Sequence, residues 1–92
     1  MKQEVIQCIG ESRIIVIVRK LKDEYLLPAA EAMHRGGIRM IEVTYDPSGK
    51  FSEENTLRQI ELLRSHFGGD MYVGAGTVLF PRQVEEAHKA GA

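Results

Sequence analysis

The sequence predicts an α/β fold in which a short N-terminal helix precedes three strand–helix units. The first observation is a continuous β-branched run within residues 13–18, RIIVIV, which is typical of a strand buried on both faces. The second is that comparable strands begin again at residues 38 and 71. Counted from residue 14, the starts lie 24 and then 33 residues apart, which leaves room for a crossover helix. Strands joined in this way run parallel, so we expect a parallel sheet.

The first half of the chain contains two predicted helices. Residues 2–10 carry apolar side chains at helical spacing, and Gly10 can end that helix. The second helix is expected over residues 23–37, where a Gly-Gly pair supplies the C-cap. Its Pro28 is compatible with a helix if it falls near the first turn, because amide donors there lack partners anyway.

The remaining elements follow the same alternation. The second strand is expected over residues 38–44, IRMIEVT, and the proline and glycine of residues 45–51 indicate a loop. A third helix is expected over 52–69, a third strand over 71–78, and a fourth helix, opening with a proline, over 81–92. The apolar stripe that the third helix should turn toward the core consists of Leu57, Ile60, Leu63 and Phe67.

Length and composition fit one small globular domain. The chain has 92 residues, is 43% hydrophobic and carries a net charge of −1. Without a block of like charges, neither a nucleic acid nor a membrane surface is an expected partner. Cys8 is a lone cysteine, so no internal disulfide forms, a cytoplasmic location is expected, and the thiol should be a small buried hydrophobe. His34, His66 and His88 lack metal-ligand spacing and are expected at the surface, so we predict no metal site.

Polar residues lie toward the carboxyl ends of all three predicted strands, where parallel α/β folds place their sites. Alternation puts Arg19 on one face of the first strand, and Glu42 with Thr44 on one face of the second. In the third strand, Thr77 is expected to share a face with Val73 and Ala75. We therefore predict that these polar side chains meet at one end of the sheet.

Glu42 is a charged residue within an apolar strand, and two interpretations stay open. It could be a buried glutamate paired with Arg19, which would hold adjacent strands in register. It could equally be a general acid/base with a tuned pKa in a cleft.

The stretch GAGT, residues 74–77, also has two interpretations. G-x-G without a third glycine is a weak phosphate-loop signal. The better interpretation is a strand whose glycines, Gly74 and Gly76, let a ligand or a neighbouring backbone come close, with pure packing as the alternative. Thr77 would then offer a hydroxyl to the ligand. Lys20 could in principle form a Schiff base, but a solvated surface lysine is the favoured interpretation.

Two motifs make the sequence resemble a known family. GGIRMIEVT, residues 36–44, is followed by YVGAGTVLFPRQVEEAHKAGA, residues 72–92. In that order and spacing they resemble the N-terminal part of the aldolases of 2-keto-3-deoxy-6-phosphogluconate (KDPG) and 4-hydroxy-2-oxoglutarate (KHG). The similarity covers nearly the whole chain.

This resemblance implies a (β/α)8 TIM barrel, usually a homotrimer, that acts as a class I aldolase on a small keto-acid substrate without a metal or other cofactor. A lysine attacks the substrate ketone, and the resulting iminium accepts the electrons of the broken carbon–carbon bond, which releases pyruvate. Glu42 matches the family's acid/base glutamate. Arg19, Thr44, Gly76 and Thr77 are expected to bind the substrate.

The sequence departs from the family pattern in two respects. Many members read EVTLRT, where the arginine holds the anionic end of the substrate; here the stretch is EVTYDP, with Asp46 at that position. The family's Schiff-base lysine lies on the sixth strand, beyond residue 92. We therefore expect residues 1–92 to be one partial domain that stops before the fourth strand, roughly two-fifths of a barrel. On its own it should be inactive.

Two further hypotheses stay open. A non-catalytic α/β module could complete its sheet by self-association, because three strands leave exposed edges. A different phosphate-binding barrel enzyme, such as an epimerase or isomerase, would keep the fold. The IEVT and GAGT motifs argue against that last possibility.

Overall fold

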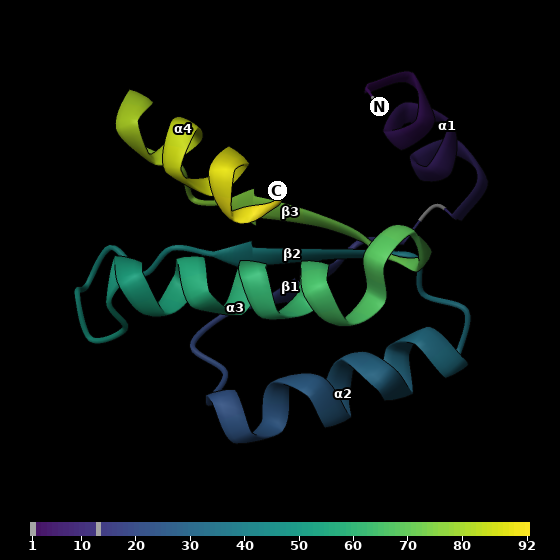
Figure 1. The fold of residues 1–92 in the computed structure, drawn as a ribbon, viewed down its shortest axis with the longest axis horizontal. Helices are drawn as coiled ribbons and strands as arrows, with labels where there is room; N and C mark the ends of the chain where they lie inside the picture. Colours follow the sequence, from purple (N-terminus) through teal and green to yellow (C-terminus); the bar gives the residue numbers. More distant parts are fainter. Residues whose placement is uncertain (1, 13) are drawn as a thin grey trace.

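A computed structural model describes the backbone of residues 2–12 and 14–92, and the side chains of 2–7 and 14–92. The expectations for the Cys8 thiol and for Arg13 at the start of the first strand lie outside this description. The elements in chain order (Figure 1) are α1 (Lys2–Ser12), β1 (Val16–Val18), α2 (Asp23–Arg35), β2 (Met40–Thr44), α3 (Glu53–Phe67), the short 3₁₀ helix η1 (Gly68–Asp70), β3 (Tyr72–Gly76) and α4 (Pro81–Ala90).

The three strands form one parallel sheet in the order β1-β2-β3, which confirms the predicted α/β organisation. In register, Ile17 of β1 lies beside Glu42 of β2, and Glu42 lies beside Gly74 of β3. The next position on the same face of β2, Thr44, lies beside Gly76. This face therefore carries every predicted site residue that lies within a strand, and we call it the inner face.

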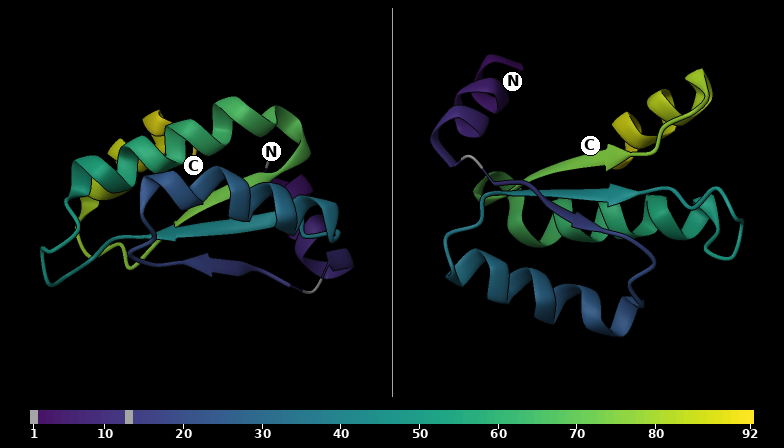
Figure 2. Two further views of the ribbon diagram at one scale, coloured as in Figure 1. Left: turned by 90° about the horizontal axis from the view of Figure 1, so that it is seen from below. Right: turned by 180° about the vertical axis from the view of Figure 1, so that it is seen from behind.

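The opposite face of the sheet is covered by helices. Figures 1 and 2 show α2 and α3 side by side beneath it, whereas α1 lies on the other side, near the amino ends of the strands. Helix α4 follows β3 and packs against α3. The core between sheet and helices consists of Val18, Leu26, Ala30, Ile41, Val43, Ile60, Leu63, Met71, Val73, Ala87 and Ala90.

The predicted helix stripe of α3 is confirmed. Ile60 and Leu63 are fully buried, and Leu57 and Phe67 pack against the core from its margin. Ser52 caps the helix by accepting a hydrogen bond from the Asn55 amide at 3.1 Å, which satisfies one of its free N–H groups.

Two expectations about the first half need correction. The first strand is not buried on both faces, because Ile17 is 59% exposed and no described residue covers the inner face there. Pro28 lies inside α2, at its sixth residue, and not in the first turn. Its missing amide therefore removes a bond to the Glu24 carbonyl, one turn earlier.

The third strand also differs from the expected alternation. Val73 and Ala75 lie beside Ile41 and Val43, on the helix-covered face, so the prediction that they share a face with Thr77 in an extended strand is wrong. Strand β3 ends at Gly76, and the backbone of Thr77 has a left-handed φ of 54°. That turn ends the alternation, and it decides where the threonine hydroxyl lies.

Candidate active site at the carboxyl ends of the strands

Strained backbone marks the carboxyl ends of the two outer strands. Among the described residues, Lys20 after β1 and Thr77 after β3 are the non-glycine positions with positive φ, 55° and 54°. A β-branched residue in this conformation is an outlier. Such strain costs on the order of 1–3 kcal/mol and gathers at functional sites. The end of the sheet that the sequence indicated is therefore also where the backbone is least relaxed.

Glu42 occupies space that Gly76 leaves free. A Cβ atom placed on Gly76 would lie 2.3 Å from Oε2 of Glu42 and 2.8 Å from Cγ2 of Thr44. A side chain at position 76 would therefore have to displace the Glu42 carboxylate and the Thr44 methyl group. Gly74 differs, since a Cβ there would have no atom within 4 Å. Packing against Glu42 and Thr44 therefore explains the glycine at position 76, whereas Gly74 borders open space.

Glu42 is half-buried as a residue, and its carboxylate oxygens are accessible and have no hydrogen-bond or ion-pair partner among the described residues. The interpretation of Glu42 as a structural ion pair with Arg19 is therefore not what the resting site contains. An accessible carboxylate without a protein partner is free to exchange a proton with a ligand, as a general acid/base must.

Arg19 instead reaches across the sheet. Its Nη2 donates to Oγ1 of Thr77 at 3.4 Å, although β2 lies between their strands. The span is about two strand spacings, or roughly 10 Å, so the guanidinium lies over the end of β2. Arg19 and Thr77 therefore contact each other at the end of the sheet where polar side chains were expected, and Thr77 does so from the left-handed turn after β3.

Thr44 is buried, and its hydroxyl donates to the Val18 carbonyl at 3.2 Å, which ties the ends of β1 and β2 together. Only the lone pairs of that oxygen are left for a ligand. Its role in substrate binding stays a prediction.

Asp46 organises the loop after β2. Its carboxylate accepts hydrogen bonds from the Ser48 amide and hydroxyl and from the Phe51 amide, and its side chain is only 3% exposed. The Ser48 hydroxyl is the main cause, with the two amides and Lys20 contributing, of a pKa that falls from 3.8 to about 2. The Lys20 ammonium lies 3.7 Å from Oδ1. Sequence reasoning missed this cluster, although D-P-S-G is a typical aspartate-initiated turn.

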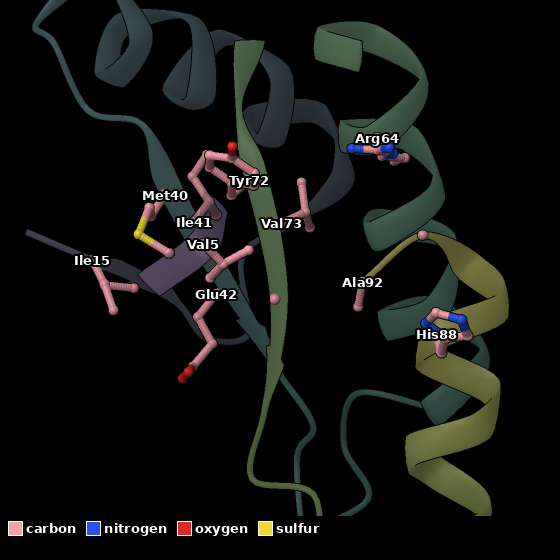
Figure 3. Close-up of a pocket in the computed structure, with 12 residues that line it drawn as sticks. Val5, Ile15, Met40, Ile41, Glu42, Arg64, Tyr72, Val73, His88 and Ala92 are labelled. Atoms are coloured by element: carbon pink, nitrogen blue, oxygen red, sulfur yellow. The ribbon is translucent and has the colours of Figure 1, made fainter. Parts of the chain in front are cut away.

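A cavity of about 320 Å³ surrounds the free edge of β3. Figure 3 shows Ile15 and Glu42 on one side of the strand and His88 and Ala92 on the other. Glu42 thus borders a partly open, largely apolar space as well as the inner face of the sheet.

A second cavity, of about 300 Å³, lies beyond the strand ends, with Tyr45, Asp46, Thr77 and Phe80 in its wall. Tyr45 is buried and donates to the Gln83 carbonyl at 3.4 Å. Burial, with the charges of Glu86 and Glu53, raises the pKa of its phenol. The wall of this cavity thus contains both Thr77, from the candidate active site, and residues of the loop after β2 that Asp46 stabilises.

Comparison with known proteins shows which family the chain is similar to. The family model described as KDPG and KHG aldolase matches residues 5–92. A 2-dehydro-3-deoxy-phosphogluconate aldolase of Pseudomonas aeruginosa is 33% identical over 89% of this chain and 34% of its own length. A KHG/KDPG aldolase of Escherichia coli is 36% identical over 85% of this chain and 32% of its own length. A 2-dehydro-3-deoxy-phosphogluconate aldolase of Haemophilus influenzae is 30% identical over 98% of this chain and 39% of its own length.

The chain belongs to the KDPG and KHG aldolase family. It spans about a third of the length of the curated relatives it matches. No solved structure matches it significantly.

Two searches of the described residues bear on other kinds of site. None of their helices combines the length and apolar character that a membrane span needs. They also contain no group of three or more histidine, cysteine or acidic side chains placed to hold a metal ion, and His34, His66 and His88 are all exposed.

The two glycines of β3 give a matched pair of variants. Gly76→Ala should lower the free energy of unfolding by about 1–3 kcal/mol, because the new methyl group displaces the Glu42 and Thr44 side chains. Gly74→Ala should leave it unchanged or raise it slightly, by about 0.4–1 kcal/mol, since its methyl group meets no atom. Urea unfolding of both variants measures the difference. Equal costs at the two positions would contradict the packing of Glu42 on Gly76.

The lowered pKa of Asp46 predicts an acid-dependent loss of stability. A carboxylate whose pKa is lower in the folded state stabilises the fold while it is ionised, so its contribution is complete above about pH 4. It should be lost as the pH falls from 3.8 to about 2. Urea unfolding at several pH values should show this loss in the wild type and in Glu85→Gln, an exposed control, and a smaller one in Asp46→Asn. The same acid profile in all three proteins would refute the assignment.

Proposed function

We propose that this chain supplies the proton-transfer part of a class I aldolase, a carbon–carbon lyase that cleaves a 2-keto-3-deoxy-6-phospho sugar acid to pyruvate and glyceraldehyde 3-phosphate. The observation that carries the proposal is Glu42, a half-buried residue on the inner face whose carboxylate has no protein partner among the described residues, next to a strained strand end. The names of the relatives support the reaction class.

The described residues would divide the work as follows. Glu42 takes and returns the proton that moves when the carbon–carbon bond breaks and the pyruvate carbon is reprotonated. Arg19 offers its remaining N–H groups to anionic oxygens of the substrate, and the Thr77 hydroxyl fixes the guanidinium over the end of β2. This arrangement binds and orients a keto acid beside a proton carrier.

The Schiff-base lysine is the group that we do not assign to this chain. Lys20 lies two residues after the end of β1, and its side chain is 46% exposed and in contact with the Asp46 carboxylate. A nucleophilic lysine is activated in a desolvated or cationic environment, which differs from this one. We propose that the nucleophile comes from a later strand of a complete TIM barrel, which acts in the cytoplasm as a homotrimer, as the family resemblance implies.

One observation favours a second candidate, a self-associating α/β module without catalytic activity. Ile14, Ile15 and Ile17 are 54%, 44% and 59% exposed, and the described part of the chain covers neither them nor the outer edge of β3. A second copy could bury both. This candidate leaves the unpaired carboxylate of Glu42 unexplained, so the aldolase remains the better proposal.

The first test is incubation of the 92-residue chain with pyruvate and borohydride, followed by intact mass spectrometry. We expect the mass to be unchanged, because reduction traps only an imine and the chain lacks the activated lysine. A pyruvyl adduct would instead place the nucleophile within these residues, with Lys20 as the first candidate.

The second test grafts residues 1–92 in place of the matching segment of the Escherichia coli KHG/KDPG aldolase. The chimera should cleave KDPG, and Glu42→Gln should lower its kcat by about 10²–10⁴-fold while pyruvate trapping persists. Glu54→Gln, an exposed glutamate of α3, is the matched control and should leave kcat unchanged. Full activity of the Glu42→Gln chimera would remove the proposed role.

A further inference from the structure

We infer that Lys20 is a second substrate-binding cation of this site, and that Asp46 positions it. The ligand group is an anionic oxygen cluster, the carboxylate of the keto acid or the phosphate at its far end. The inference rests on the proposed function, since it names the part of the same site that holds the substrate's charge.

The two cations at the end of β1 diverge. Arg19 and Lys20 are adjacent in the chain, yet Arg19 contacts Thr77 after β3 and Lys20 contacts Asp46 after β2. The left-handed backbone of Lys20, with φ 55°, separates them. A lysine in an extended conformation would have a lower backbone energy. The divergence of the Arg19 and Lys20 side chains therefore comes with a strained backbone at Lys20.

Each cation contacts a residue in the wall of the same cavity. The 300 Å³ space beyond the strand ends has Thr77 and Asp46 in its wall; Arg19 contacts the first of these and Lys20 the second. The two positive charges therefore lie near opposite parts of the strand ends at which the cavity begins. Two positive charges at one end of the sheet suit an anionic ligand.

Asp46 is suited to position a cation and poorly suited to bind a ligand itself. Its oxygens already accept hydrogen bonds from Ser48 and Phe51, and its side chain is 3% exposed. Its distance of 3.7 Å from Nζ of Lys20 exceeds the 2.7–2.9 Å of a charge-assisted hydrogen bond. The ammonium is therefore attracted to a fixed point while its N–H donors stay available to an incoming anion.

The test is titration of the ¹⁵N-labelled 92-residue chain with pyruvate, glyceraldehyde 3-phosphate and neutral glyceraldehyde, followed by NMR. At least one anionic probe should shift the amide signals of Lys20, Asp46 and Thr77. A shift with pyruvate identifies the carboxylate as the bound group, and a shift with glyceraldehyde 3-phosphate alone identifies the phosphate.

A variant of the lysine tests its contribution. Lys20→Gly should weaken that binding about tenfold, the value of one charged hydrogen bond. Glycine suits the left-handed backbone, so this variant should stay folded. Lys50→Met, an exposed lysine of the neighbouring loop, is the control and should bind like the wild type.

The positioning role of Asp46 requires its own readout. Asp46→Asn should weaken anion binding in the wild type but have no further effect in Lys20→Gly, because it acts through the lysine. Lys20→Arg should restore most of the affinity. Equal affinities in Lys20→Gly and Lys50→Met, or no shift with either anion, would overturn the inference. An inactive grafted chimera whose Lys20 still binds the anion would refute the aldolase and leave this site standing.

Discussion

The candidate site depends on the close approach of the Glu42 carboxylate to the backbone of β3. In register, Gly74 lies beside Glu42 and Gly76 two residues further on, and the Glu42 carboxylate occupies the space that a Cβ on Gly76 would fill. Any other residue at position 76 would push the carboxylate away. The parallel register and the glycine of the GAG motif together therefore determine where the Glu42 carboxylate lies.

Around that contact, the site is assembled from strand ends that are tied together in pairs. Thr44 joins β2 to the Val18 carbonyl of β1, and Arg19 joins β1 to Thr77 beyond β3. Both ties are side-chain hydrogen bonds, and the second involves Thr77, whose backbone angle most residues avoid. The strained backbone angles lie at the strand ends where the ligand is expected to bind. The strands and helices around the core have ordinary backbone angles.

Sequence patterns predicted the order of elements and the end of the sheet that carries the polar residues, because periodicity and spacing report directly on strands, helices and crossovers. The same patterns failed where a single backbone angle determines the position of a side chain. Thr77 was expected to continue an alternation that its left-handed φ ends, and the Asp46 cluster depends on a turn whose partner, Lys20, lies 26 residues earlier. Burial of Ile17 was overestimated because a β-branched run does not reveal whether both faces are covered.

Strand β2 lies between its two neighbours, so its backbone is hydrogen-bonded on both sides, whereas β1 and β3 are the outer strands of the described sheet. Glu42 therefore belongs to the most rigid strand, and the groups expected to bind the substrate come from turns after the outer strands and from a loop. The position of Glu42 is thus fixed by a central strand, whereas the expected substrate-binding groups lie on turns and a loop, which can change more easily. A change in one of these turns or in the loop would therefore alter the groups expected to contact the substrate, while β2 and the glycine beside Glu42 keep their geometry.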